Sequence, residues 1–182
     1  MNPSFYTIGH STRTLEEFID LLRMAKVELV ADIRTVPRSR ANPQYNRDTL
    51  PDSLATFGID YEFIAQLGGL RSKSRTVLPD VNSFWKNRSF HNYADYALSD
   101  AFQEGLDKLI ELGHKRCCAM MCAEAVWWRC HRRIVSDYLL ARGEVVFHLM
   151  GHTRIEAAHF TEGAHVHPSC QVTYPSQHTA ID

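Results

Sequence analysis

A strand–helix–strand pattern within the first 33 residues constrains the fold more than any other feature of the sequence. Residues 5–8 form a short β-rich run that stops at Gly9, and 27–33 form a second strand. We expect Ser11 or Thr12 to cap the helix between them. Its apolar positions recur at helical spacing and are Leu15, Phe18, Ile19, Leu22 and Ala25. Two strands joined in this way lie parallel through a right-handed crossover.

The rest of the chain continues this alternation of strands and helices. The pattern predicts further strands over 59–64, 117–122 and 145–149. It predicts a helix over 47–57 and a long amphipathic helix from Ala94 to a C-cap at Gly113. A last helix begins within 124–128 and runs to Gly143. The 117–122 strand is apolar throughout, which is typical of a strand buried on both faces.

This order predicts a single three-layer α/β domain with a mainly parallel, Rossmann-like sheet. We expect residues 1–150 to form the α/β core. Residues 151–182 are a histidine-bearing C-terminal extension, either packed on the same domain or partly disordered.

Composition excludes several classes of protein. The 20 basic and 21 acidic residues give a formal charge of -1, which rules out a strongly basic nucleic-acid coat. No apolar run approaches the roughly 18 residues that a membrane span needs, and the N-terminus does not resemble a signal peptide. Four of the five cysteines fall within fourteen positions, which favours reduced thiols over a disulfide framework. We therefore expect a cytoplasmic protein without a membrane partner.

Polar residues follow several of the predicted strands, where a parallel α/β sheet binds its ligands. They are His10 and Ser11 after the first strand, Asp32 and Arg34 at the end of the second, Cys122 and Glu124 after the 117–122 strand, and His148 near the end of the last. We expect these side chains to meet at one edge of the sheet.

Asp32 and Arg34 lie two positions apart and face the same side of a strand. They could form a structural ion pair. Alternatively, Arg34 could bind an anionic group together with Arg38 and Arg40 while Asp32 orients it, because the planar guanidinium group matches phosphate or carboxylate.

The segment from Cys122 to Arg132 has the highest density of reactive groups. We expect Cys130 and His131 to lie in the first turns of a helix. Glu124 could be a general acid or base whose pKa is tuned by partial burial. Cys122 or Cys130 could be a thiolate nucleophile supported by His131 and a helix N-terminus. A zinc site would also use these residues, but the spacing lacks the usual C-x-x-C pair, and buried structural cysteines are a further alternative.

Together these motifs resemble a known family. They are Thr7-Ile8-Gly9-His10-Ser11, Asp32-Ile33-Arg34 with Pro37 and Ser39-Arg40, Leu67-Gly68-Gly69, Met121-Cys122-Ala123-Glu124, Cys130-His131-Arg132, Glu156 with His159 and Thr161, and Tyr174-Pro175. The chain resembles the bacterial and archaeal domain-of-unknown-function family 488 along its whole length. It departs from the family over 125–129, where the family has a polar stretch that often contains lysine and proline. The resemblance implies a small cytosolic α/β protein and supplies no reaction.

The leading functional prediction is an enzyme, such as a hydrolase or transferase, that acts by acid/base chemistry on an anionic, phosphate-bearing nucleotide or nucleic-acid segment. In this interpretation the anion is bound by Ser11, Arg34, Arg40, Arg71 and Arg132. Glu124 with Asp32 or His10 transfers protons, and Cys122 or Cys130 assists. No cofactor or metal is expected.

Two alternatives stay open at this point. One is a non-catalytic nucleic-acid-binding module that uses the loops over 34–40 and 71–75. The other is a thiol redox or sulfur-transfer protein that uses Cys122 and Cys130. The sequence leaves the oligomeric state open.

Overall fold

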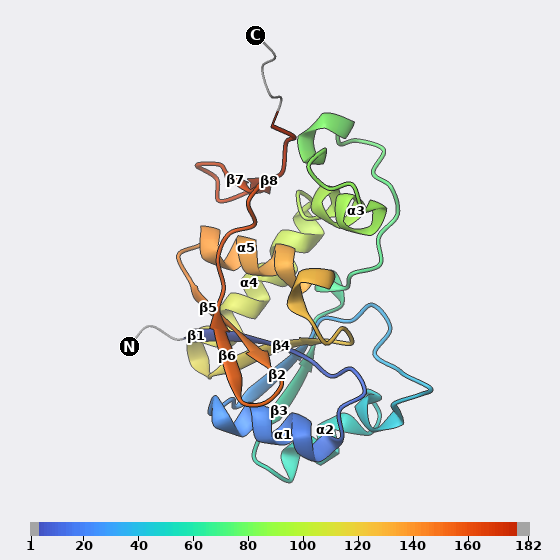
Figure 1. The fold of residues 1–182 in the computed structure, drawn as a ribbon, viewed down its shortest axis with the longest axis vertical. Helices are drawn as coiled ribbons and strands as arrows, with labels where there is room; N and C mark the ends of the chain where they lie inside the picture. The colour runs from blue at the N-terminus through green and yellow to red at the C-terminus, as the bar shows by residue number, and fades with distance from the viewer. Residues whose placement is uncertain (1–3, 178–182) are drawn as a thin grey trace.

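The computed structural model describes residues 4–177, and its centre is a six-stranded sheet in the order β3-β2-β4-β1-β5-β6 (Figure 1). The strands are β1 (Ser4–Gly9), β2 (Leu29–Asp32), β3 (Asp60–Phe63), β4 (Cys118–Cys122), β5 (Val145–Met150) and β6 (Arg154–Ala157). Neighbouring strands from β3 to β5 are parallel, and β6 pairs antiparallel to β5. The predicted mainly parallel, Rossmann-like sheet is therefore confirmed. β1 and β2 are parallel as expected, with β4 between them.

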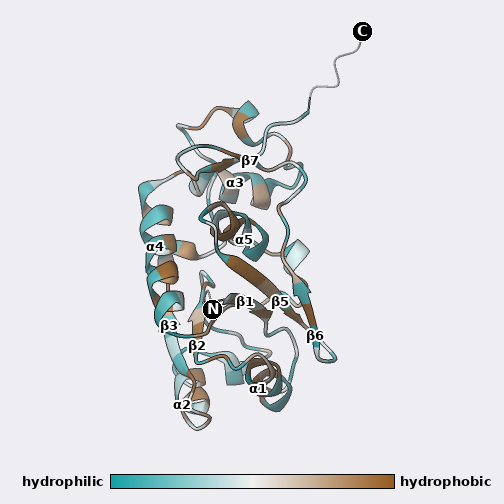
Figure 2. Ribbon diagram, turned by 90° about the vertical axis from the view of Figure 1, so that its left-hand side faces the viewer, coloured by the Kyte–Doolittle hydropathy of each residue, from teal (hydrophilic) through white to brown (hydrophobic). Residues whose placement is uncertain are grey.

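Helices cover both faces of this sheet and form the outer two of three layers (Figure 1). They are α1 (Leu15–Met24) and α2 (Leu50–Ala55) on one face, and α3 (Arg88–Tyr96), α4 (Asp100–Lys115) and α5 (Arg132–Ala141) on the other. The side chains of β4 alternate between two cores: Met120 packs in the α4–α5 core, and Met121 packs in the α1–α2 core. Figure 2 shows the apolar β5 between α1 and α5.

The long amphipathic helix was predicted with the wrong extent. The helix expected from Ala94 to Gly113 is interrupted, because Ser99 accepts a hydrogen bond from the backbone N–H of Phe102 and caps a new helix, α4. α4 then continues past Gly113 to Lys115. A Cβ atom on Gly113 would overlap the ring of Phe5, so this glycine permits close packing on β1 instead of ending the helix.

Two helix starts were also misplaced. α1 is capped by Thr14, which forms a capping box with Glu17, and not by Ser11 or Thr12. α5 begins at Arg132 and not within 124–128. A short 3-10 turn, η4 (Trp127–Arg129), precedes it, and Cys130 then takes an extended backbone conformation that delays the helix.

The segment after β5 contributes to the fold. Besides β6, it forms a two-stranded sheet of β7 (His165–Val166) and β8 (Val172–Thr173). The Tyr174 side chain is buried, and its hydroxyl donates a hydrogen bond to Asp137 Oδ2 over 2.7 Å.

The remaining 3-10 turns are η1 (Pro43–Tyr45), η2 (Ala65–Leu67) and η3 (Pro79–Asn82). The last five residues of the predicted C-terminal extension, 178–182, lie outside the described residues. Within 4–177, none of the helices has the length and apolar character that crossing a membrane requires.

Candidate functional site

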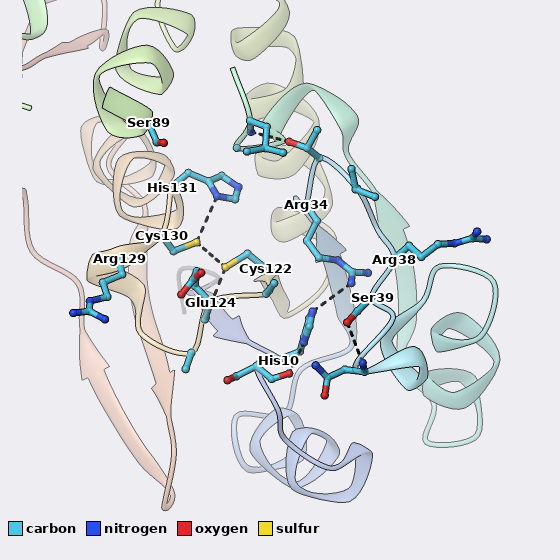
Figure 3. Close-up of a pocket in the computed structure, with 18 of the residues that line it drawn as sticks. His10, Arg34, Arg38, Ser39, Ser89, Cys122, Glu124, Arg129, Cys130 and His131 are labelled. Atoms are coloured by element: carbon cyan, nitrogen blue, oxygen red, sulfur yellow. Dashed lines mark hydrogen bonds between the residues drawn. The ribbon is translucent and has the colours of Figure 1, made fainter. Parts of the chain in front are cut away.

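A pocket of about 730 Å³ lies at the carboxyl ends of β1, β2 and β4 (Figure 3). It brings together seven of the predicted site residues, which are His10, Ser11, Arg34, Cys122, Glu124, Cys130 and His131. Loop residues complete its wall, and among them are Val36, Arg38, Ser39, Gly69, Leu70, Ser89, Phe90 and Arg129. The position agrees with the expectation that a parallel sheet presents its site at the carboxyl ends of its strands.

Two glycines allow the walls of this pocket to approach each other. A Cβ atom on Gly9 would overlap the backbone carbonyl oxygen of Glu124, so the end of β1 packs directly against the segment after β4. A Cβ atom on Gly69 would lie 2.6 Å from Nδ1 of His131. Two residues after Gly9, Ser11 adopts a left-handed conformation with φ of 46°, which is uncommon for a residue with a side chain. The backbone here is shaped closely around the pocket.

On one side of the pocket, Asp32 and Arg34 form a buried ion pair. Arg34 Nε donates to Asp32 Oδ1 over 2.9 Å, and Arg34 Nη2 donates to Oδ2 over 2.7 Å. The second carboxylate oxygen also accepts a hydrogen bond of 2.5 Å from the Tyr61 hydroxyl. Arg34 Nη2 additionally donates to the backbone carbonyl of Tyr45. The geometry is that of a structural ion pair, the first of the two alternatives considered for this motif. We call this group the carboxylate cluster.

His10 belongs to the same side of the pocket. Its ring stacks on Tyr45 at 4.3 Å between centroids. Nδ1 donates to the carbonyl of Ser11 over 2.9 Å, so Nε2 is the nitrogen that accepts from Arg34 Nη1 at 3.4 Å. Burial lowers the pKa of His10, and the positive charge of Arg34 lowers it further. Both ring nitrogens are therefore occupied by neighbouring groups in this arrangement.

The opposite side of the pocket holds two cysteine thiols in contact. Cys122 Sγ and Cys130 Sγ are 2.6 Å apart, and both cysteines are free. Figure 3 shows the two sulfur atoms facing each other in the pocket, with His131 beside them. Cys130 Sγ also accepts from the backbone N–H and from Nε of Arg132, both at 3.4 Å. His131 Nδ1 lies 3.5 Å from the same sulfur. We call these four residues the thiol cluster.

These contacts shift the pKa values of the two thiols in opposite directions. Burial by itself raises the pKa of Cys130, but the hydrogen bond from Cys122 and the groups of His131 and Arg132 hold that pKa well below its usual range. Burial raises the pKa of Cys122 well above its usual range, and the bond to Cys130 adds to this effect. These directions favour the thiolate form at Cys130 and the thiol form, which donates to it, at Cys122.

Arg132 is the buried cation that donates to Cys130 Sγ. Its side chain is 1% exposed, and within residues 4–177 no carboxylate lies within ion-pair distance of it. Its Nη1 donates to Thr7 Oγ1 over 3.1 Å, and its Nη2 donates to the carbonyl of Glu124 over 2.7 Å. A buried guanidinium group needs a negative partner, and Cys130 Sγ is the group that Nε faces.

His131 connects the two sides of the pocket. Its Nε2 donates to the carbonyl of Ile33 over 2.8 Å, directly between Asp32 and Arg34 in the sequence. This hydrogen bond fixes the ring so that Nδ1 faces Cys130. Tyr93 packs edge-on against the ring at 5.1 Å between centroids. His131 can thus exchange a proton with Cys130 while its own orientation stays fixed.

Five predicted residues differ from expectation in their surroundings. Glu124 is exposed, so the expected partial burial of its carboxylate is wrong; the backbone carbonyl of Glu124, not its side chain, joins the thiol cluster. Arg40 is exposed and outside the pocket lining. Arg71 is also outside it, because its guanidinium group lies over the Tyr96 ring and donates to the carbonyls of Gly68 and Ala65. Cys130 and His131 precede α5 and do not lie in its first turns.

His148 also lies elsewhere than expected. It is buried behind the pocket, where its ring stacks on Trp127 at 4.4 Å and its Nδ1 accepts from the hydroxyl of Thr7 over 2.8 Å. Because Thr7 also accepts from Arg132, a hydrogen-bonded chain runs from His148 to the thiol cluster. Burial and the positive charge of Arg132 lower the pKa of His148 to about 3.

Sequence reasoning assigned no role to the supporting residues Thr7, Tyr45 and Tyr61. A signal existed for Thr7, because a hydroxyl in a strand that is buried on both faces needs a hydrogen-bond partner. No local pattern marks Tyr45 or Tyr61. Tyr45 contacts the carboxylate cluster from η1, and Tyr61 contacts it from β3. Within 4–177, no group of three or more histidine, cysteine or acidic side chains is arranged to hold a metal ion, so the geometry gives the zinc alternative no support.

Fold and site together define a class: a three-layer α/β protein with a pair of cysteines in a pocket at the carboxyl ends of its parallel strands. The family model described as domain of unknown function DUF488 matches residues 14–139, and the chain belongs to this family. The match includes both cysteines and Arg132, whereas the Thr7–Ser11 motif and the segment after α5 lie outside it. No curated protein and no solved structure matches the chain.

Proposed function

We propose that this protein is a thiol-dependent enzyme in which the thiolate of Cys130 attacks an electrophilic substrate in the pocket. One observation carries the proposal: Arg132 is buried without a carboxylate partner among residues 4–177, and its Nε and backbone N–H both face Cys130 Sγ. A charge balanced by a sulfur atom requires that sulfur to be ionised, and the thiolate is the nucleophilic form of cysteine.

The surroundings of Cys130 support this role. The backbone N–H that faces the sulfur is the first one of α5, and the positive end of a helix dipole favours a negative charge. His131, oriented by Ile33, can supply a proton to a leaving group. The pocket volume of about 730 Å³ lies in the range of small-molecule sites. Apolar side chains at its mouth, Val36 and Leu70, are 60% and 72% exposed and offer contact to an apolar part of the substrate.

The acid/base prediction for a phosphate-bearing substrate, and the nucleic-acid alternative, have less support from the geometry. The hydrogen bonds of Arg34 and Arg132 go mainly to groups of the protein itself. Figure 3 shows Arg38 and Arg129 extending away from the sulfur atoms. Asp32 is bonded by Arg34 and Tyr61, and Glu124 is exposed. Asp32 is thus occupied by other groups of the protein, and the carboxylate of Glu124, although it lines the pocket, is oriented by no hydrogen bond among the described residues.

A titration of the thiolate tests the proposal. The ultraviolet absorbance of thiolate, measured against pH as the difference between the wild-type protein and Cys130→Ser, should show one ionised thiol throughout the neutral range. Iodoacetamide should alkylate Cys130 at a rate that changes little over this range, whereas the rate at an ordinary thiol rises about tenfold per pH unit below its pKa.

Cys117→Ser is the matched control, because Cys117 lies next to β4 at its opposite end and burial raises the pKa of its thiol. This variant should leave the neutral-pH absorbance unchanged. If the wild-type and Cys130→Ser proteins have the same absorbance at neutral pH, Cys130 is not the thiolate and the proposal fails.

A further inference from the structure

We propose that the electrophile is a sulfur atom and that Cys122 is the resolving thiol, so that the site exchanges its dithiol with the disulfide bond of a small substrate. This inference rests on the proposed function, because it needs Cys130 as the attacking thiolate. It assigns a second catalytic residue, a substrate class and a two-electron redox reaction.

The positions of the two thiols carry the inference. Cys122 is the last residue of β4, and the hydrogen bond from the His10 N–H to its carbonyl holds it in place over 2.9 Å. Its sulfur is 2.6 Å from Cys130 Sγ, so a substrate sulfur bound to Cys130 would be joined to an atom already next to a second thiol. The extended segment at Cys130, between η4 and α5, provides the second sulfur from a different element. A nucleophile that works alone does not need such a neighbour.

Other electrophiles would need water and a general base in the second half of the reaction, and His131 is the one group of the described site that is placed to act as that base. A covalent intermediate at carbon or phosphorus is released by water, which needs a general base to activate it. Among the described residues of this site, Asp32 is bonded by Arg34 and Tyr61, the nitrogens of His10 are occupied, and Glu124 is exposed. An intermediate that contains a disulfide bond needs no water, because the thiol of Cys122 can release it.

The exchange balances in two steps. The Cys130 thiolate attacks one sulfur of R–S–S–R′, forms a mixed disulfide with R, and expels R′–S⁻, which takes a proton from water. The sulfur of Cys122 then attacks Cys130 Sγ, and its proton passes to the departing R–S⁻. The substrate gains two electrons and leaves as two thiols, while Cys122 and Cys130 become a disulfide. A dithiol reductant, a second substrate class, returns the pair to its starting state.

The buried charge restricts which disulfides the site can reduce. The first step removes the negative charge that balances Arg132, so forming the mixed disulfide is opposed. The second step changes no charge at Cys130 and is not opposed in this way. The substrate must therefore have a good leaving thiolate, one of low pKa. The same geometry disfavours the transfer of a single sulfur atom, because Cys122 would discharge a persulfide on Cys130 as hydrosulfide.

Dipyridyl disulfide, a small uncharged disulfide with a good leaving group, tests this inference. The protein carries Cys117→Ser and Cys170→Ser, which remove the two partly exposed thiols outside the site. We expect it to release two pyridinethione molecules per chain and to retain no adduct, with Cys122 and Cys130 joined in the peptide map. With Cys122→Ser added, we expect one molecule released and a stable adduct on Cys130. With Cys130→Ser added instead, the rapid release should be lost.

The outcomes separate the two proposals. A single release with a stable adduct on Cys130 in the protein that keeps Cys122 would overturn the inference and leave the thiolate proposal intact. No rapid release, together with no thiolate absorbance, would overturn both. Circular dichroism checks that Cys122→Ser is folded. If it is not, the loss of two hydrogen atoms without an adduct, seen by intact mass in the protein that keeps Cys122, still decides the question.

Discussion

The carboxylate cluster and the thiol cluster each surround a buried guanidinium group, but they offer it different acidic groups. Each contains a buried guanidinium group: Arg34 is 5% exposed and Arg132 is 1% exposed. Arg34 is paired with a carboxylate through two hydrogen bonds, and that carboxylate also accepts from Tyr61. Arg132 faces the sulfur of Cys130. Both arginines stay charged, so the difference lies entirely in what the anion can do.

Under the proposed function, that difference assigns the reaction to the side of the pocket that holds the thiol cluster. Asp32 has its oxygens occupied by Arg34 and Tyr61, and a carboxylate in this position serves to hold β2 and the following loop. Cys130 can gain a proton, lose it again or form a covalent bond, and each change alters the charge beside Arg132. Under the proposed function, the carboxylate cluster is a fixed structural ion pair, whereas the thiol cluster balances its arginine with a reactive anion.

The largest effect on stability is expected from Asp32→Asn. This change leaves Arg34 charged, buried and without a counter-ion, which costs about 3–5 kcal/mol of the free energy of unfolding. Urea unfolding at neutral pH measures the loss. Asp48→Asn is the matched control, because it breaks the pair of Asp48 with Arg38, whose side chains are 65% and 70% exposed. We expect the control to cost less than about 1 kcal/mol.

Arg132→Met removes one partner of the thiol cluster, as Asp32→Asn does in the carboxylate cluster. The two stability costs can therefore be compared directly. Here the remaining partner is a thiolate, which can take up a proton and so avoid a buried unpaired charge. The stability cost should be only about 1–2 kcal/mol from lost hydrogen bonds. The pKa of Cys130 should rise, so its alkylation should begin at higher pH. A cost equal to that of Asp32→Asn would contradict the assignment of Cys130 as the balancing anion.

The next effect is a dependence of stability on pH that arises at His148, which is connected to the thiol cluster through Thr7. The pKa of His148 is lowered to about 3 by burial and by Arg132, against 6.5 in the unfolded chain. Between these values the unfolded chain binds a proton that the folded protein does not. The free energy of unfolding therefore falls as the pH drops, by about 2 kcal/mol between pH 6.5 and pH 5. His148→Asn should remove this contribution, as measured by urea unfolding at both pH values.

Comparison with the wild-type protein isolates this contribution. His10, whose pKa is lowered by burial, contributes in the same direction, whereas Asp137, whose pKa is raised by burial to about 6, contributes in the opposite direction. Both remain in the variant and cancel in the difference. Arg132→Met should also reduce the slope, because it removes the charge that depresses the pKa of His148. An unchanged slope in His148→Asn would show that this histidine is protonated in the folded state as readily as in the unfolded chain.

The two clusters also differ in how far the sequence predicts them. The alternation of apolar strands and amphipathic helices predicts the parallel sheet, and strand ends then predict that His10, Arg34 and Cys122 share a pocket. The contacts that these and other residues make in the folded protein could not be predicted in the same way. The burial of Arg132 depends on where α5 begins, and that start was misplaced because the extended conformation of Cys130 has no pattern of its own. The contact of Tyr61 with Asp32 joins residues 29 positions apart, which periodicity does not reveal.

The smallest effect, and the one that best separates the two functional interpretations, is expected from Glu124→Gln. The exposed side chain of Glu124 lies outside both clusters, and the contacts of this residue with Arg132 and Cys122 go through its backbone carbonyl. The substitution keeps that carbonyl and removes only the acid. We expect the rate of disulfide exchange at Cys130 to change less than about twofold, whereas loss of a general acid or base lowers a rate by about 10²–10⁴. The rate of pyridinethione release measures this directly. A fall of about 10²–10⁴ would indicate that Glu124 acts as a general acid or base. Glu156→Gln, which removes the carboxylate facing Nε1 of Trp127, provides a comparison for any effect of charge near the thiol cluster.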